Sequence, residues 1–221
     1  MVYLKDRIFE NKQELRQAVW AYMEDHHLVT FPRPCFGRIP NFHGAEAAAA
    51  RLAALPEWHE ARVIFATPDS ALHPARVRAL EEGKALLVAA PRITGFYLLK
   101  DIHPEEAFQA ASIKGFGEFG QPVTLGPALP RVGLYLTGAV AVDRQGNRIG
   151  KGAGYGDQED LLLSQAKLID ENTPRVALVH DIQVFEDFSP LMRRHDRRID
   201  LIVTPERIYR IHWVAENNDP H

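Results

Sequence analysis

Arg62-Val-Ile-Phe-Ala66 and Ala85-Leu-Leu-Val-Ala-Ala90 are two short apolar runs that decide the expected fold. Neither run alternates between apolar and polar residues, which is typical of strands that are buried on both faces of a parallel sheet. Between them, Pro74 suits the first turn of a helix that reaches Glu82, and Gly83 follows as a helix stop signal. This strand-helix-strand order predicts an α/β protein with a mainly parallel sheet.

The segments before this unit predict two helices and a loop. Residues 11 to 25 have the apolar spacing of a helix. Asn11 suits the N-cap, and Glu14, three residues later, suits the reciprocal hydrogen bond from the N-cap backbone amide. The alanine-rich run from Ala45 to Leu55 predicts a second helix. Residues 26 to 43 are expected to form a loop, because two closely spaced prolines there exclude a helix.

The segments after the unit continue the alternation of strands and helices. We expect a weaker helix after Pro104, strands near 133–137, 139–142, 176–179 and 201–203, a turn over 143–146 and a helix over 157–170. A Gly/Pro-rich passage from Gly115 to Pro130 is the one candidate linker. Because strands of the same type lie on both sides of it, we expect residues 1–221 to form a single domain.

Composition excludes several classes of protein. With 46% hydrophobic and 25% charged residues the chain is neither disordered nor fibrous. Its 26 basic and 29 acidic residues give a net charge of -3, so we expect no nucleic-acid partner. A lone cysteine, Cys35, excludes an internal disulfide and fits a reducing compartment. Because no apolar stretch approaches the roughly 18 residues of a bilayer span, we expect a soluble cytoplasmic protein with no membrane partner.

Arg148-Ile-Gly-Lys-Gly-Ala-Gly-Tyr-Gly-Asp157 is the segment most informative about chemistry. Its alternate glycines expose backbone amides directly before a predicted helix, a combination that can hold a phosphate. It matches neither a Walker loop nor a dinucleotide fingerprint. Spacing alone leaves open a flexible glycine hairpin as the alternative. Asp157 suits either the N-cap of the helix or a carboxylate that holds magnesium beside phosphates.

Five segments, taken together and in this order, carry a family resemblance. They are Lys12-Gln-Glu-Leu-Arg16, Gly83-Lys84 before an apolar strand that ends at Pro91, Ala139–Asp143, Gly146–Asp157, and His195-Asp196 before Asp200–Thr204. This set resembles the 5-formyltetrahydrofolate cyclo-ligase family, also called methenyltetrahydrofolate synthetase, over nearly the whole chain. The nearest likeness is to its divergent branch of methenyltetrahydrofolate synthetase domain-containing proteins. The resemblance implies a three-layer, Rossmann-like α/β domain.

The resemblance also implies an activity. A ligase of this family uses ATP and Mg²⁺ to convert 5-formyltetrahydrofolate into 5,10-methenyltetrahydrofolate, with release of ADP and phosphate. ATP, magnesium and a folate are therefore the expected cofactors and small-molecule partners. Phosphoryl transfer of this kind depends on positioning and charge neutralisation more than on a protein nucleophile.

Roles for individual residues follow from the same resemblance. The residues expected to bind ATP are Lys12, Arg16, Gly150, Lys151, Gly152, Ala153, Gly154 and Asp157. Arg148 and Tyr155 are the expected catalytic residues, Asp157 would also hold the metal, and His195 and Asp196 would lie beside the site.

Each of these roles has a simpler alternative. Lys12 and Arg16 are spaced as on a solvated helix face, and Arg148 is placed to pair with Asp143 across the predicted turn. His195 and Asp196 lie within an arginine-rich run and suit an ordinary charged loop.

The chain departs from the family pattern at two places. The usual loop reads Gly-Gly-Gly-Tyr-Tyr-Asp-Arg, whereas this chain has Ala153, Gly156 and Gln158 at three of those positions. A segment that usually supplies a folate-binding carboxylate reads Ala71-Leu-His-Pro74. Two alternatives therefore stay open, an ATP-dependent enzyme acting on another heterocycle, such as a thiamin-related one, and a non-catalytic nucleotide-binding family member.

Overall fold

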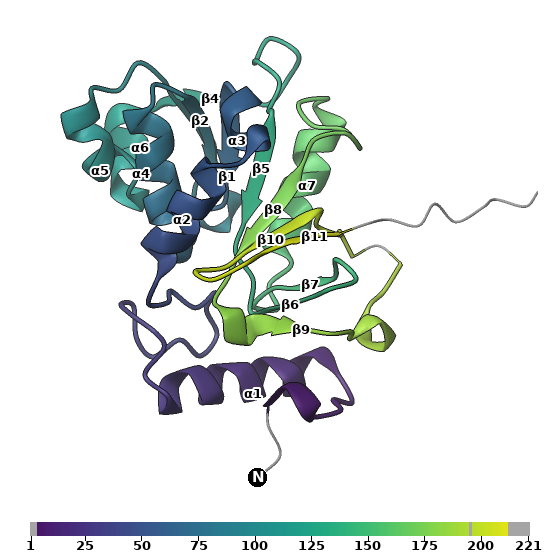
Figure 1. Cartoon of the computed structure of the whole chain (residues 1–221). Coiled ribbons are helices and arrows are strands. Elements are labelled where there is room, and N and C mark those ends of the chain that lie inside the picture. Colours follow the sequence, from purple (N-terminus) through teal and green to yellow (C-terminus); the bar gives the residue numbers. More distant parts are fainter. Residues whose placement is uncertain (1–3, 195, 212–221) are drawn as a thin grey trace, which may run out of the picture.

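One eight-stranded sheet organises the chain, whose computed structural model describes residues 4–194 and 196–211 (Figure 1). Its strand order is β11-β10-β8-β5-β1-β2-β3-β4. The strands are β1 (Val63–Ala66), β2 (Ala85–Ala89), β3 (Phe96–Leu99), β4 (Gln121–Val123), β5 (Leu134–Thr137), β8 (Arg175–Leu178), β10 (Leu201–Val203) and β11 (Ile208–Arg210). β10, β8, β5, β1 and β2 pair in parallel, and the outer strands pair antiparallel. The predicted mainly parallel sheet is confirmed.

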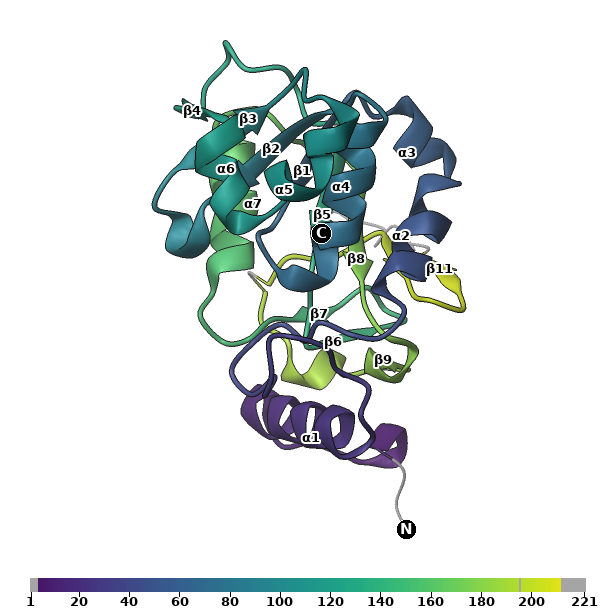
Figure 2. The same ribbon diagram turned by 90° about the vertical axis from the view of Figure 1, so that its left-hand side faces the viewer.

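Helices cover both faces of this sheet and create three layers (Figure 2). The helices are α1 (Lys12–Asp25), α2 (Ala45–Ala53), α3 (Pro56–Glu60), α4 (His73–Glu81), α5 (Ala107–Ala110), α6 (Ile113–Phe119) and α7 (Tyr155–Gln165). Short 3-10 helices lie at Leu4–Asp6, Ser70–Leu72, Pro91–Ile93, Pro104–Glu106, Asp181–Gln183 and Ser189–Leu191. In β1, Ile64 packs in the core with α2, α4, α5 and α6, whereas Phe65 packs in the core with α7. Burial on both faces explains why the strand sequences do not alternate.

A small second sheet connects α1 to the rest of the molecule. It consists of β7 (Arg148–Ile149), β6 (Ala141–Asp143) and β9 (Val184–Phe185), and it lies between the large sheet and α1 at the bottom of Figure 1. Leu15 and Val19 of α1 are fully buried in the same core cluster as Ile149. This packing places one face of α1 opposite the start of the glycine-rich loop.

The predicted capping of α1 is largely confirmed. The Asn11 side chain accepts a hydrogen bond from the Glu14 amide at 2.9 Å. Glu14 Oε2 accepts from the Glu10 amide at 2.9 Å, one residue earlier than the reciprocal cap would require. Both bonds satisfy backbone amides at the start of the helix.

The predicted helix over 157–170 is shifted in the structure. α7 begins at Tyr155, and its N-cap is Gly154 in the left-handed conformation. Asp157 lies in the first turn, so its interpretation as the N-cap is wrong. The helix ends at Gln165, and Leu168 and Ile169 beyond it are buried in the core.

The Gly/Pro-rich passage from Gly115 to Pro130 is only partly irregular. Its first residues belong to α6 and the next to β4. A Cβ added at Gly115 would lie 2.0 Å from the Gln109 carbonyl oxygen, so this glycine permits close packing of α6 against α5. Close packing, not a linker, accounts for glycine at this position.

Candidate functional site

A cavity of about 880 Å³ opens where the parallel strands β1, β2 and β5 end. Residues that follow these three strands line it, including Thr67–Ser70 after β1, Pro91 after β2 and Gly138 after β5. β1 has β2 on one side and β5 on the other, so the connections after β1 and β5 diverge at this point. Open α/β sheets bind their ligands at such a divergence, outside the carboxyl ends of the strands.

Three cations from α1 and β7, Lys12, Arg16 and Arg148, form what we call the cationic side of the cavity. Lys12 and Arg16 are one helical turn apart and therefore lie on the same face of α1. Lys12 Nζ donates to Asp196 Oδ2 at 2.5 Å, and Arg16 Nε donates to the Gly150 carbonyl oxygen at 2.7 Å. Burial lowers the pKa of Arg16. The two side chains face the cavity, so their interpretation as a solvated helix face is wrong.

Arg148 forms an ion pair with Asp157, the carboxylate to which the family resemblance gives the metal-binding role. Its Nη2 donates to Asp157 Oδ1 at 2.6 Å, and its side chain is only 8% exposed. A Cβ at Gly156 would lie 2.8 Å from Arg148 Nη1, so the guanidinium occupies the space that a side chain at this position would need. The Arg148 guanidinium therefore takes the space that a tyrosine side chain at position 156 would need.

The alternative pairing of Arg148 with Asp143 is wrong. Asp143 is fully buried, and its two carboxylate oxygens accept hydrogen bonds from Asn147 and from the amides of Gln145 and Phe188. It therefore stabilises the turn after β6 and the segment after β9 rather than the cavity.

The glycine-rich loop is held in a defined conformation. Gly152 and Gly154 have φ values of +104° and +74°, which favour glycine over every other residue. Lys151 is exposed, and its Nζ lies 5.9 Å from the centre of the Tyr155 ring. With Arg16 bonded to Gly150, the loop is anchored at its start, which argues against a freely flexible hairpin.

Two carboxyl groups, Asp69 and Glu159, form what we call the acidic side of the cavity. Asp69 Oδ2 accepts from Thr67 Oγ1 at 2.7 Å. The fully buried Arg76 donates through Nη1 to the carbonyl oxygens of both Thr67 and Asp69, at 2.8 and 2.9 Å, and burial lowers its pKa to about 10. The buried guanidinium of Arg76 therefore fixes the backbone of the segment Thr67–Asp69, which follows β1.

Glu159 lies on α7 and is only 3% exposed. Its side chain lines the cavity. Burial raises the pKa of the Glu159 carboxyl to about 8, and the negative charge of Asp69 acts in the same direction. Neither carboxyl group is among the site residues predicted from the sequence. A carboxylate directly after a predicted strand end was the one available signal, and it pointed to Asp69 alone.

Most residues selected from the sequence meet in this cavity. They are Lys12, Arg16, Arg148, Gly150, Lys151, Gly152, Gly154, Tyr155, Asp157 and Asp196. Ala153 is exposed and does not line the cavity. His195 lies outside the described residues. Asp196 accepts from the Arg193 amide as well as from Lys12, which places the end of the arginine-rich run beside α1.

The donor set fits a magnesium ion that is shared with phosphates. In residues 4–194 and 196–211, no group of three or more His, Cys, Asp or Glu residues is arranged to hold a metal ion. Mg²⁺ in phosphoryl-transfer sites takes one or two protein carboxylates, and its remaining ligands are phosphate oxygens and water. Asp157, which is 37% exposed beside the glycine-rich loop, is suited to be that carboxylate.

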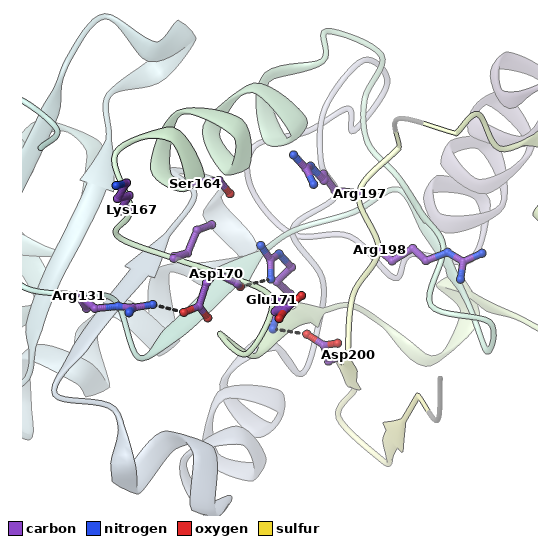
Figure 3. Close-up of a pocket in the computed structure, with 10 residues that line it drawn as sticks. Arg131, Ser164, Lys167, Asp170, Glu171, Arg197, Arg198 and Asp200 are labelled. Carbon is purple, nitrogen blue, oxygen red and sulfur yellow. Dashed lines mark hydrogen bonds and ion pairs between the residues drawn. The ribbon is translucent and has the colours of Figure 1, made fainter. Parts of the chain in front are cut away.

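A second cavity of about 680 Å³ lies near the amino ends of β5, β8 and β10 (Figure 3). Several of its cations are already neutralised, because Arg131 pairs with Asp170 and Arg175 Nε donates to Asp160 at 2.6 Å. It also lies at the opposite end of the strands from the divergence of β1 and β5. These features favour the first cavity as the functional site.

No helix of the described part of the chain combines the length and the apolar character of a bilayer span.

Comparisons with known proteins show a family for this chain. The model of the 5-formyltetrahydrofolate cyclo-ligase family matches residues 8–205. The methenyltetrahydrofolate synthase domain-containing proteins of Mus musculus and Homo sapiens are 39% and 34% identical to this chain over 203 residues, which is 90% of the chain. The matched region is 54% and 53% of those two proteins, so the chain spans about half the length of these relatives.

Solved structures confirm the fold. The 5,10-methenyltetrahydrofolate synthetase of Aquifex aeolicus superposes with a TM-score of 0.56 and 22% identity, over 95% of this chain and 99% of that one. The enzyme of the same name from Mycoplasma pneumoniae superposes with a TM-score of 0.51 and 15% identity, over 88% and 98%. At these identities the likeness concerns the arrangement of strands and helices.

Proposed function

The chain belongs to the 5-formyltetrahydrofolate cyclo-ligase family, and on this premise we propose that it converts 5-formyltetrahydrofolate into 5,10-methenyltetrahydrofolate with Mg-ATP. One observation carries the proposal. Lys12, Arg16 and Arg148, from segments more than 130 residues apart, meet beside a glycine-rich loop and one partly exposed carboxylate. Such a convergence suits a polyphosphate that must be both positioned and neutralised.

Each residue of the cationic side has a distinct part in this proposal. Lys12 and Arg148 would exchange their carboxylate partners, Asp196 and Asp157, for phosphate oxygens. Arg16 would hold the loop in place through the Gly150 carbonyl oxygen, so that the loop amides stay directed at the phosphates. Mg²⁺, held by Asp157, would supply neutralisation of the charge that develops during transfer.

The chemistry requires activation of a poor leaving group. The formyl oxygen of 5-formyltetrahydrofolate takes the terminal phosphoryl group of ATP, and ADP departs. N10 then attacks the activated carbon and loses its proton, and the C–O bond breaks with departure of phosphate. The protein's part is to align the formyl oxygen with the phosphoryl group and to exclude water, which is how positioning lowers such barriers. Tyr155, which begins α7 at the cavity wall, is suited to contact the bound substrate or nucleotide.

The test is turnover of 5-formyltetrahydrofolate with Mg-ATP, followed by the near-ultraviolet absorbance of the methenyl product. We expect product with the wild-type protein and none with Asp157→Asn. Absence of product from a wild-type protein that binds ATP would refute the reaction while leaving the nucleotide site in place.

A second function is favoured by the departures in the substrate region. Ala71 and Leu72 are fully buried and the segment Ala71–Pro74 has no carboxylate, whereas the acidic side places carboxyl groups at Asp69 and Glu159. An ATP-dependent reaction on another heterocycle would suit this altered arrangement. A family member that binds nucleotide without turnover predicts instead that no heterocycle is consumed.

We also propose that residues 1–221 act as one domain in the cytoplasm, without a nucleic-acid or membrane partner. Helices on both sides of one continuous large sheet support the single domain. The net charge of -3 supports the absence of a phosphate-backbone partner.

A further inference from the structure

We propose that Arg193 is a further phosphate-binding residue of this protein, whose guanidinium contacts the polyphosphate chain of a nucleotide bound at the cationic side. The inference rests on the proposed function in one respect, because it takes a polyphosphate as the ligand of the cationic side. It adds a residue to which the family resemblance gives no role, and it identifies the contacts that hold this residue beside the site.

The first step is the position of Arg193 relative to Lys12. Asp196 Oδ2 accepts two hydrogen bonds, from Lys12 Nζ at 2.5 Å and from the Arg193 amide at 2.6 Å. One oxygen atom therefore joins the backbone of Arg193 to a cation of the cationic side. Arg193 and Lys12 also line the same cavity. Because its backbone is fixed beside the Lys12 amine, the long side chain of Arg193 can contact the same ligand as that amine.

The second step is how the segment around Arg193 is held. We call the segment that carries Arg193, Asp196 and Arg197 the strap. Besides its contact with α1 through Asp196, it is attached to α7, because Arg197 Nε pairs with Asp160 Oδ1 at 3.3 Å. Asp160 is only 2% exposed, and its other oxygen accepts from Arg175 Nε of β8 at 2.6 Å. The strap is thus attached to two helices that line the cavity, α1 and α7.

The third step is the charge that a polyphosphate needs. On the cationic side, Lys12 and Arg148 are each paired with a carboxylate. Arg193 is exposed, and among the described residues no hydrogen bond or ion pair involves its guanidinium. Its positive charge can therefore meet a ligand without first leaving a carboxylate. Sites for phosphoryl transfer must neutralise several phosphate oxygens, and a guanidinium can donate to two of them at once.

The fourth step is the comparison with other exposed arginines. Arg38 and Arg92 also line the cavity, but within the described part of the chain no hydrogen bond or ion pair ties either side chain to the cationic side. Arg194 is exposed but does not line the cavity. Attachment through Asp196 and a place on the cavity wall together distinguish Arg193. Its neighbour Arg194 offers a matched control with the same charge.

The test is calorimetric titration with a non-hydrolysable ATP analogue and Mg²⁺, without any heterocyclic substrate. Arg193→Ala removes a charged hydrogen-bond donor, so we expect the analogue to bind about tenfold more weakly. The circular dichroism spectrum should not change, because the side chain is exposed. Arg193→Gln, which keeps most of the length of the side chain, should weaken binding as Arg193→Ala does. Arg193→Lys keeps the charge without the planar guanidinium and should restore only part of the affinity.

The control variant is Arg194→Ala, which removes the same charge one residue away and should leave the affinity within about twofold of wild type. Long-range attraction between charges would weaken both alanine variants alike and would fade with added salt, whereas a contact is lost only at Arg193. The inference is overturned if wild-type protein does not bind the analogue, if Arg193→Ala and Arg193→Gln bind it as wild type does, or if Arg194→Ala weakens binding equally. Failure of the proposed function looks different: nucleotide affinity depends on Arg193, and 5-formyltetrahydrofolate is not turned over.

Discussion

The cationic and acidic sides of the cavity differ in how their charges are satisfied. On the cationic side, Lys12 and Arg148 are paired with carboxylates and Arg16 is bonded to a carbonyl oxygen. On the acidic side, Asp69 accepts a hydrogen bond from Thr67, and burial raises the pKa of the Glu159 carboxyl to about 8. A paired cation keeps its position before ligand arrives, and pre-organised charges cost no reorganisation during reaction. A carboxyl group whose pKa is raised by burial carries less negative charge near neutral pH, so the two sides of the cavity differ in charge as well as in position.

Among the substitutions that test the cationic side, Asp157→Asn is expected to have the largest effect on ATP affinity. The variant keeps an oxygen that can accept from Arg148 but loses the charge that a magnesium ion needs. We expect the gain in ATP affinity on adding Mg²⁺ to fall by about 100-fold, as for loss of a metal-orienting group. Calorimetric titration with ATP in the presence and absence of Mg²⁺ measures it.

Unchanged Mg²⁺-dependent affinity in Asp157→Asn would remove Asp157 from the metal role. The ion pair with Arg148 would then be only a structural contact of the cationic side.

A smaller effect is expected for Arg16→Ala. The variant loses both a cation and the bond to the Gly150 carbonyl oxygen, whose length is 2.7 Å. A hydrogen bond from a charged group contributes about 1.5–3 kcal/mol, which corresponds to roughly 10- to 100-fold weaker ATP binding. Arg16→Lys is the matched control, because it keeps the charge without the planar guanidinium. If Lys restores full affinity, charge alone matters and the anchoring of the loop does not.

Lys12→Ala tests the same side with a smaller expected change. The lysine is partly exposed, at 23%, and its charge is already offset by Asp196, so we expect about fivefold weaker ATP binding and an unchanged circular dichroism spectrum. Asp196→Asn should have the opposite effect, because it frees the same lysine from its carboxylate. Equal ATP affinity in wild-type protein and Lys12→Ala would restrict the phosphate-binding role to the two arginines.

The two sides also differ in how far the sequence could predict them. The glycines of the loop, Lys12, Arg16 and Arg148 are recognisable because their residue types and order match a family pattern. The apolar strands are likewise recognisable, because burial on both faces leaves a continuous apolar run. The structure adds that Gly152 and Gly154 have positive φ, which is the physical reason for glycine there.

The burial of Glu159 could not be predicted from the sequence. It follows Gln158 and precedes Asp160 near the start of a helix, where acidic residues are favoured by the helix dipole and are commonly solvated. In the structure Asp160 is buried against Arg175, and Glu159 is buried against the cavity. Both environments come from segments distant in sequence. The edge strand β4 escaped prediction because its residues, Gln121–Val123, are exposed or partly exposed and do not form an apolar run.

The last comparison concerns what holds α1, and with it the cationic side, in place, where the smallest change in ATP affinity is expected. α1 is joined to α2 through residues 26–44, and Cys35 in this connection is 1% exposed against α1. Burial, together with the nearby negative charge of Glu24, raises the pKa of the Cys35 thiol from 9.0 to about 12. At pH 8 the folded protein should thus hold about 1,000-fold less thiolate than an unperturbed cysteine and should react slowly with a thiol reagent.

Glu24→Gln would show what fixes this connection. Glu24 accepts from the Cys35 amide at 2.6 Å and pairs with Arg33, so the variant loosens the segment and lowers the thiol pKa at the same time. We expect labelling of Cys35 to accelerate severalfold, with ATP affinity within about twofold of wild type because the cations on α1 are unchanged. Rapid labelling of the wild-type protein would mean that α1 separates from the connection in solution, and the two sides of the cavity would then not be held at a fixed distance.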